Sequence, residues 1–305
     1  MHPLRIALFG LVLIAAASPQ WSSGVRSVPP YKHIFVIMDE NKNFATIVNP
    51  AAAPNISALA KAYGNATNFF AEAHPSEPNY VALVGGDTFG IADDGYHTID
   101  APNLGMQLTK AGLSWKGYYE SIPVPGSEAS FAGLYAFKHS GFMNFASVRN
   151  DPDRATHIVG FDQLNRDLAS NTLPSFALIV PNLCNDMHGA RSCPDESELI
   201  ARGDAVIGDL VQKIQRSAAW NAADNVAIVI TFDESENKTE PGGGHIPTIV
   251  ITNHGPRKKS DNTAYTHYSL LRTIEDAFGI QTYLGHAQEA KPMLPLFAVS
   301  GLRQP

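Results

Sequence analysis

A serine lies between two prolines in the segment HPSEPNY, which runs from His74 to Tyr80. Pro78 suits the first turn of a helix, because the N–H that proline lacks would be unpaired there anyway. Ser76 is therefore expected just before a helix that runs through NYVALV. Its hydroxyl would face free backbone N–H groups and the positive end of the helix dipole, where anions bind. The segment predicts chemistry on an anionic group.

Polar side chains also follow three apolar segments of the chain. They are Asp39, Glu40 and Asn41 after HIFVIM, Asn185, Asp186 and His188 after SFALIV, and Asp233 and Glu234 after VAIVITF. Clusters of carboxylate and amide oxygens suit a hard divalent cation. The metal ligands that this pattern predicts are Glu40, Asn41, Asp233 and Glu234. The alternative is that these acids cap helices or lie in solvent.

A serine hydroxyl is a weak nucleophile until a base or a metal activates it. The chain has no G-x-S-x-G elbow and no H-E-x-x-H motif, so neither a serine hydrolase triad nor a zinc protease is indicated. A metal-bound serine at a helix start fits phosphoryl transfer, with histidines adding positive charge or protonating the leaving alcohol. The candidate histidines are His139 and His188, followed by His74, His245 and His267.

The elements that must position these groups follow from the apolar pattern. Four short runs rich in Ile and Val do not alternate with polar residues, as in strands covered on both faces. They are 33–38, 175–180, 226–232 and 248–252. Helical patterns between them cover 51–63, 104–111, 197–218 and 268–278. This alternation predicts the α/β class, a three-layer α/β/α sandwich around a mostly parallel sheet, with ligands beyond the carboxyl ends of the strands.

We expect one catalytic domain over residues 28–300, because no repeat, linker or low-complexity segment divides the 305 residues. Residues 119–160 have the least regular pattern and are expected to form a cap or loops over one edge of the sheet. The net charge is −7 and no block of Lys or Arg occurs, so nucleic acid is not an expected partner. A monomer is expected.

The chain begins with MHPLRIALFGLVLIAAASPQ, in which Arg5 precedes an apolar run from Ile6 to Ala17 and small residues follow. This pattern predicts a secretory signal peptide within residues 1–20 and a secreted or periplasmic protein. An uncleaved membrane anchor is the alternative. No later segment is long and apolar enough for a stable membrane span.

The two cysteines, Cys184 and Cys193, enclose the short segment NDMHGARS, and in an exported protein they are expected to form a local disulfide. A thiol nucleophile is the weaker alternative, since nothing marks either cysteine as activated.

The chain resembles the phosphoesterase family of secreted acid phosphatases and bacterial C-type phospholipases, a branch of the alkaline phosphatase-like superfamily. The matching segments run in the family's order from about residue 33 to 280 and are HIFVIMDENKNF, HPSEPNY, YAFKHSGFMNF, VPNLCNDMHG, TFDESE, GGGHIPTIVIT and YTHYSLLRTIEDAFGI. Each motif alone is of modest specificity, and the order of all seven carries the resemblance.

The resemblance implies a role for each matching residue. Ser76 is the nucleophile that forms a phosphoserine and also touches one divalent ion, which could be Ca²⁺, Mg²⁺, Mn²⁺ or Fe²⁺. The other metal ligands are Glu40, Asn41, Asp233 and Glu234. His188 lies beside the phosphate, with Asp186 to orient it. The remaining substrate-binding residues are Lys138, His139, Asn79 and His245.

The implied activity is a metal-dependent acid phosphatase with an acidic optimum, acting on phosphate monoesters. A small phosphorylated molecule or a phosphoinositide head group is the expected substrate. A phospholipase C-type phosphodiesterase is the alternative, although such members usually carry further C-terminal domains. A non-enzymatic protein with a structural metal is a third hypothesis, and a serine at the helix start disfavours it.

Overall fold

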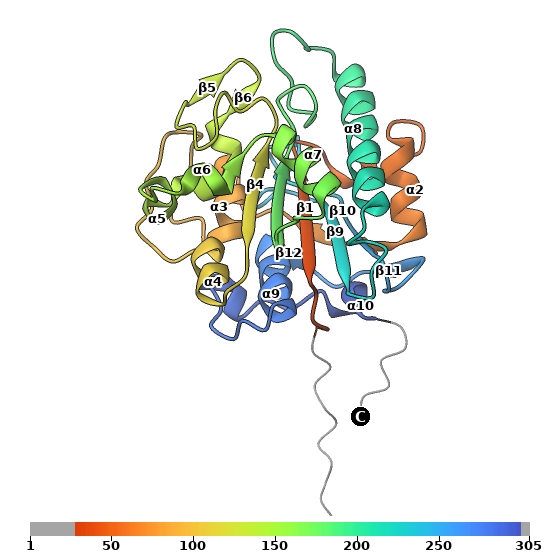
Figure 1. Cartoon of the computed structure of the whole chain (residues 1–305). Helices are drawn as coiled ribbons and strands as arrows, with labels where there is room; N and C mark the ends of the chain where they lie inside the picture. Colours follow the sequence, from red (N-terminus) through yellow and green to blue (C-terminus); the bar gives the residue numbers. More distant parts are fainter. Residues whose placement is uncertain (1–27, 300–305) are drawn as a thin grey trace, which may run out of the picture.

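A computed structural model describes residues 28–299 of the chain. The predicted signal peptide lies outside the described residues. Figure 1 shows a central sheet with helices on its flanks, and β1 runs upward from the lower end of the view. The strands of the main sheet are β1 (His33–Asp39), β2 (Gly64–Ala66), β4 (Trp115–Tyr119), β7 (Ile158–Val159), β8 (Phe176–Val180), β9 (Val226–Phe232), β10 (Thr248–Thr252) and β11 (Lys259–Asp261).

Within the described residues these eight strands have the order β11-β2-β10-β9-β1-β8-β4-β7. β1 pairs in parallel with β8 and β9, and Ile34 lies opposite both Phe176 and Ala227. β10 is antiparallel to β9 and to β2. The sheet is therefore mixed but mostly parallel, and the predicted fold class is confirmed.

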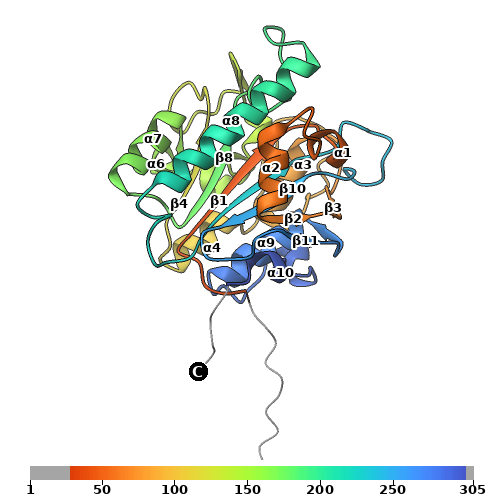
Figure 2. The same ribbon diagram turned by 90° about the vertical axis from the view of Figure 1, so that its right-hand side faces the viewer.

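Helices flank the sheet in packed pairs. α2 (Pro54–Ala62) contacts α8 (Glu196–Arg216), and α3 (Glu77–Gly85) contacts α9 (His267–Ala277). In Figure 2, α2 and α8 cross in front of the strands. The other helices are α1 (Phe44–Ile47), α4 (Leu104–Lys110), α5 (Ala146–Arg149), α6 (Arg154–His157), α7 (Phe161–Ser170), α10 (Leu294–Phe297) and the 3₁₀ helices η1 (Phe137–His139), η2 (Phe142–Asn144) and η3 (Gly285–Gln288).

The residues of β1 and β9 explain why these runs form central strands. Nearly all their side chains are buried, so both faces carry Ile, Val and Phe instead of alternating with polar residues. α8 instead has one apolar face, and the Asp195 side chain accepts a hydrogen bond from the Glu198 N–H at its start. The four predicted strands and the four predicted helices all occur, with ends that differ by a few residues.

Short elements fill the segment between β4 and α7. The hairpin of β5 (Phe131–Ala132) and β6 (Tyr135–Ala136) is followed by η1, which carries Lys138 and His139, and by η2. In Figure 1 this hairpin lies at the upper end, where β1 and β4 finish. A second small sheet pairs β3 (Phe69–Phe70) with β12 (Tyr265–Thr266). The hairpin segment thus borders the carboxyl ends of the strands.

Candidate active site

Three neighbouring strands bring their following loops to one edge of the sheet. The Glu40 N–H, after β1, donates to the Asp186 carbonyl after β8, at 2.8 Å. The Asp233 N–H, after β9, donates to the Asp39 carbonyl at 2.9 Å. These backbone bonds continue the parallel pairing of the strands, so the three polar clusters found in the sequence meet at this edge.

Ser76 is the residue before α3, and its hydroxyl points at a carboxylate rather than capping the helix. Its Oγ donates to Glu40 Oε2 at 3.0 Å, and no side-chain cap bond is made. Glu40 Oε1 accepts from the Tyr80 hydroxyl at 2.7 Å and lies 3.1 Å from His139 Nε2. Both carboxylate oxygens of Glu40 are thus directed at groups that can exchange or donate protons.

The start of α3 differs from the prediction that free N–H groups face Ser76. The Glu77 N–H donates to Asp94 Oδ1 at 3.1 Å, so a carboxylate of this chain already lies at the helix start. The physical reason is the helix dipole, which attracts the nearest anion. The predicted anion position is therefore occupied by Asp94.

The other predicted metal ligands lie close to Glu40 and Ser76. The Asn41 N–H donates to Asp233 Oδ1 at 2.8 Å, and the Asn41 amide donates to Glu40 Oε2 at 2.8 Å. Ser76 Oγ lies 3.5 Å from Glu234 Oε1. Asn41 has a φ of 53°, in the left-handed region that asparagine tolerates. This turn brings the Asn41 N–H to Asp233, the residue that follows β9.

The carboxylates at this edge are buried and close together. Burial raises the pKa of Glu40 to about 7 and that of Glu234 to about 7. Burial, followed by the charge of Glu40, raises the pKa of Asp233 and of Asp186 well above the usual value. Grouped negative charges in a buried place favour either protonation or a cation.

The donor set fits a divalent cation. In the described part of the chain, Asp233 Oδ2 is buried and has no hydrogen-bond partner, and Ser76 Oγ and a Glu234 oxygen lie nearby. A second arrangement also fits, because ligand atoms of Glu40, His139 and His188 lie within 4.8 Å of one another. Both arrangements use Glu40. A buried Glu/His/His group that could hold a metal is thus present. The sequence pattern did not predict that these three residues lie together.

Lys138 and the two histidines form the positive side of the edge. Lys138 Nζ lies 3.2 Å from His188 Nε2 and donates to Asp94 Oδ2 at 2.9 Å. His188 Nδ1 lies 2.9 Å from the Gly189 carbonyl and must donate to it, which leaves Nε2 to accept from Lys138. Burial lowers the pKa of His139 and of His188, and the Lys138 charge adds to this.

Asp186 acts differently from the expected orientation of the His188 ring. Its Oδ1 accepts from the backbone N–H of His188 at 2.8 Å, and its Oδ2 lies 3.3 Å from Nδ1 of His139. The ring of His188 is instead held by Gly189 and Lys138. Asp186 therefore fixes the loop that carries His188 and contacts the ring of His139. The loop turns tightly at Met187, whose φ is 72°.

Asn79 fastens the loop before Ser76. Its side-chain oxygen accepts from the N–H groups of Glu72 and Ala73, at 2.9 and 3.1 Å. Its amide nitrogen donates to the carbonyls of Ala73 and Pro75. These bonds hold the backbone that presents the serine, and a direct contact between Asn79 and substrate stays a prediction.

His245 and His267 have other contacts. The His245 ring stacks between Phe44 and Phe70, with centroid distances of 4.7 and 5.1 Å, and its Nε2 lies 3.2 Å from the Thr67 carbonyl. His267 is buried at the start of α9, with Nε2 2.9 Å from the Phe232 carbonyl, and burial lowers its pKa to about 4. No recorded contact joins either ring to Ser76 within residues 28–299.

The sequence pattern gives too little weight to three residues near Ser76. His74 Nδ1 contacts Glu234 Oε2, Tyr80 bonds Glu40, and the Tyr80 ring stacks on His139 at 5.3 Å. Tyr80 could have been found, because residues four apart share a helix face and Ser76 directly precedes α3. Asp94 comes from a distant exposed loop, and its sequence carries no signal for the contact.

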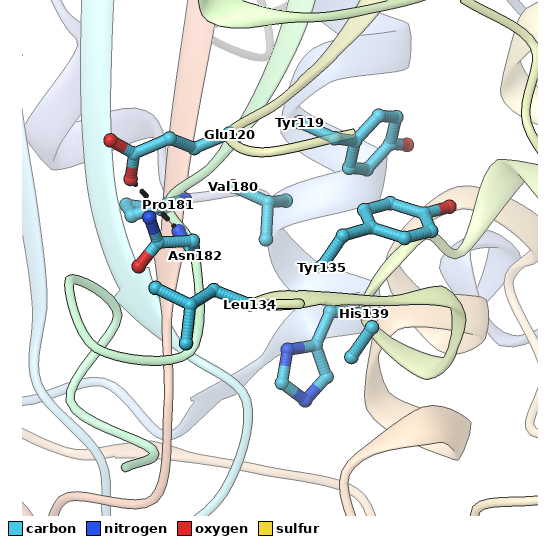
Figure 3. Close-up of a pocket in the computed structure, with 9 residues that line it drawn as sticks. Tyr119, Glu120, Leu134, Tyr135, His139, Val180, Pro181 and Asn182 are labelled. Atoms are coloured by element: carbon cyan, nitrogen blue, oxygen red, sulfur yellow. Dashed lines mark hydrogen bonds between the residues drawn. The ribbon is translucent and has the colours of Figure 1, made fainter. Parts of the chain in front are cut away.

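A small cavity lies behind His139. Its volume is about 10 Å³, and it is bordered by Tyr119, Glu120, Tyr135 and Asn182 among others. Figure 3 shows Glu120 bonded to Asn182 on one side and the Tyr135 ring on the other, with His139 at the lower edge. This volume has room for about one water. It cannot hold an organic substrate.

The predicted disulfide is confirmed. Cys184 and Cys193 are bonded, and they close the segment that holds Asp186 and His188. The cross-link restricts the conformations of this loop in the unfolded chain. It therefore helps to keep the histidine loop at the strand ends.

Comparisons with known proteins agree with this arrangement. The model of the Phosphoesterase family matches residues 48–281. The "Phosphatidylinositol-3-phosphatase" of Mycobacterium tuberculosis is 32% identical over 283 residues, which is 92% of this chain and 88% of the relative. The "Acid phosphatase" of Aspergillus fumigatus is 30% identical over 87% of this chain and 59% of the relative. The chain thus spans little more than half of the fungal relative.

Solved structures show the same fold at low identity. A protein in the alkaline phosphatase superfamily from Vibrio parahaemolyticus has a TM-score of 0.59 at 13% identity, covering 92% of this chain and 76% of the other. A phosphonate monoester hydrolase from Silicibacter pomeroyi has a TM-score of 0.56 at 11% identity, covering 90% and 78%. Of the helices that the structure describes, none is sufficiently long and apolar to traverse a bilayer.

Proposed function

We propose that this chain, which belongs to the Phosphoesterase family, is a phosphoric monoester hydrolase of the acid phosphatase type with Ser76 as its nucleophile. The names of two relatives support this class, since one is a phosphatidylinositol-3-phosphatase and another an acid phosphatase. A phosphorylated small molecule or a phosphoinositide head group is the proposed substrate. The signal-like segment at Ile6–Ala17 supports export, and the N-terminal sequence of the protein recovered outside expressing cells tests it.

The observation that carries the proposal is the hydrogen bond of Ser76. Its hydroxyl donates to Glu40 Oε2 at 3.0 Å, so a buried carboxylate is in position to hold or accept the serine proton. The opposite side of the site carries Lys138, whose charge can offset that of a phosphoryl group. The Ser76 side chain makes no helix cap bond, so capping does not explain a serine at this position.

The reaction follows from these positions. Ser76 Oγ attacks phosphorus, its proton goes to Glu40, and the bond from phosphorus to the alcohol oxygen breaks. The alcohol leaves with a proton from His188, whose Nε2 must first gain a proton from solution and lose its hydrogen bond from Lys138, a change that acidic pH favours. Water then hydrolyses the phosphoserine and phosphate leaves. Lys138 offsets the charge of the negative oxygens throughout.

A divalent ion is the proposed cofactor. When bound, it would lower the pKa of the Ser76 hydroxyl and offset phosphoryl charge. The proposed ligands are Glu40, Asn41, Ser76, Asp233 and Glu234. The group of Glu40, His139 and His188 is the other arrangement that the ligand-atom distances allow.

The first test is hydrolysis of p-nitrophenyl phosphate from pH 4 to 9 by the wild type and by Ser76→Ala, each with and without EDTA. We expect Ser76→Ala to lose activity by on the order of 10³-fold or more, and EDTA to weaken the wild type. Ser57→Ala is a matched control, because Ser57 is also a buried serine but donates to the Ile47 carbonyl. Full activity in Ser76→Ala would contradict the mechanism.

The same assay separates the diesterase alternative. Bis-p-nitrophenyl phosphate presents a phosphodiester with the same leaving group. A phosphatase should hydrolyse the monoester much faster, and a higher kcat/KM for the diester would favour the phospholipase C type.

A further inference from the structure

A cavity of about 220 Å³ adjoins the positive side of the candidate active site. Its walls include Asp94, Tyr96, Ser130, Phe131, Phe137 and Lys138. Lys138 belongs to both places, because its Nζ lies 3.2 Å from His188 Nε2 and its charge acts on the Glu40 carboxylate. The cavity therefore lies directly beside Lys138, the side chain whose charge would face a bound phosphate.

We propose that this cavity, which we call the ring pocket, binds the alcohol part of the phosphomonoester and selects a hydroxyl-bearing ring, a sugar or a cyclitol. The proposal rests on the phosphatase function proposed above. It adds the place where the alcohol part binds and names Phe131 as a specificity-determining residue. The cavity behind His139, at about 10 Å³, is too small for this part of a substrate.

The walls of the ring pocket combine flat apolar faces with hydrogen-bond acceptors. Phe131 lies on the β5–β6 hairpin and is 62% exposed, so its ring is free to pack against a ligand. Such a face suits the C–H side of a sugar or cyclitol ring. Pockets of this kind, apolar with a few placed polar groups, are typical of small-ligand sites.

Asp94 determines which polar groups a ligand should carry. Its Oδ1 accepts from the Glu77 N–H and its Oδ2 from Lys138, and a carboxylate can accept about two further bonds. The side chain is 31% exposed, so these positions are accessible. Hydroxyl groups can donate to them. An acyl chain has no donor for these positions.

Another wall of the ring pocket is held by stacking. The Tyr96 ring stacks on Phe137 at a centroid distance of 4.6 Å, and the Arg149 guanidinium contacts both rings, at 4.5 Å from Tyr96 and 5.9 Å from Phe137. Arg149 itself donates to the His97 carbonyl and to Thr98 Oγ1. A preformed wall lowers the entropy cost of binding. The volume, below that of a typical drug-sized site, suits one ring rather than a long chain.

The test compares kcat/KM for glucose 6-phosphate with that for glycerol 3-phosphate. Both release a primary alcohol with hydroxyl groups, and only the first carries a ring. We expect the wild type to prefer the ring substrate about tenfold. Phe131→Ala should reduce this preference about fivefold, mainly through a higher KM, and Phe131→Trp should keep it because the flat face remains.

Val124→Ala is the control, since Val124 is an apolar residue of the same segment with 61% exposure and does not border the ring pocket. Thermal unfolding of each variant checks that the hairpin is intact. Hydrolysis of p-nitrophenyl phosphate without any ring preference, or a preference unchanged in Phe131→Ala, would overturn the ring pocket and leave the phosphatase function standing. A wild type that hydrolyses no monoester would overturn both.

Discussion

Asp233 and Asp167 are both buried aspartates next to the central sheet, but their surroundings differ. Asp167, on α7, accepts from Lys116 Nζ at 2.5 Å, from the Tyr118 hydroxyl at 2.7 Å and from Gln163. Burial raises its pKa, and these donors outweigh burial, so the pKa of Asp167 lies below its usual value. The charge of Asp167 is matched by its partners.

Asp233 accepts from the Asn41 N–H and has other carboxylates close by. Its pKa lies well above the usual value, because burial and the charge of Glu40 both disfavour ionisation. The comparison suggests how to separate structural from functional acids. A structural acid has its own donors, whereas an acid in a functional site waits for a cation or a substrate to complete its environment.

The strongest test of this contrast is Asp233→Asn. We expect activity to fall by on the order of 10³-fold, because a proposed metal ligand and its charge are lost. The thermal midpoint in EDTA should stay the same or rise, since one charge is removed from a crowded buried group. Kinetics with p-nitrophenyl phosphate and calorimetry in EDTA measure the two effects. A strongly lowered midpoint would mean that Asp233 is structural.

Asp167→Asn should behave in the opposite way. The amide cannot accept from Lys116 as a charged partner, so we expect a loss of about 3 kcal/mol in the free energy of unfolding. The kcat of the folded variant should remain within about twofold of the wild type, because Asp167 has no recorded contact with the active-site residues in the part of the chain described. Urea unfolding measures the loss of stability, and steady-state kinetics measure kcat. A large fall in kcat would contradict the distinction between Asp167 and Asp233.

Added divalent metal should bind at the Asp233 cluster and not at Asp167. A cation at one hundred times its Kd stabilises the folded state by about 2.7 kcal/mol. We expect Mg²⁺, Ca²⁺ or Mn²⁺ to raise the thermal midpoint of the wild type and of Asp167→Asn, and to have little effect on Asp233→Asn. Thermal scans at increasing metal concentration measure this. An equal shift in all three proteins would place the metal elsewhere.

The sequence predicted the parts of this arrangement that depend on local pattern. Apolar runs without alternation marked β1, β8, β9 and β10, and the acids directly after β1 and β9 marked the edge of the site. β4 was missed because Lys116 and Gly117 interrupt its apolar pattern. Lys116 is accommodated there by its ion pair with Asp167, a contact that depends on the folded chain.

Contacts between distant segments limited the prediction of the site. Asp94 reaches the start of α3 and Lys138 from an exposed loop, and Asp186 contacts His139 rather than the ring of its neighbour His188. Each contact depends on how loops pack over the sheet. Residue type and spacing along the chain give no information on that packing, whereas they do identify the polar residues that come directly after each strand.

Glu275 shows that a raised pKa alone does not define a functional acid. It is buried on α9, its Oε1 accepts from the Leu284 N–H at 2.9 Å, and its Oε2 has no partner among the described residues. Burial raises its pKa from 4.5 to about 7. Unlike Asp233, which accepts from Asn41 in the predicted ligand set, Glu275 has no recorded contact with the candidate active-site residues in the described part of the chain, so we expect its effect to be confined to stability.

The raised pKa of Glu275 determines how its contribution to stability changes with pH. Between pH 4.5 and 7 the folded protein holds a proton on Glu275 that the unfolded chain has released, so stability falls as pH rises through this window and levels off above it. Glu275→Gln keeps the side chain neutral. The free energy of unfolding of this variant, relative to the wild type, should therefore increase by about 3 kcal/mol from pH 4.5 to pH 8.

Urea unfolding of both proteins at the two pH values measures this difference. Glu289→Gln, at an exposed glutamate in the neighbouring segment, should show no such change. If Glu275→Gln instead altered kcat and left the pH dependence of stability unchanged, the distinction between a solitary buried acid and the clustered acids around Ser76 would fail. Clustering around the proposed nucleophile, and not the pKa of any single acid, is what marks the candidate active site in this fold.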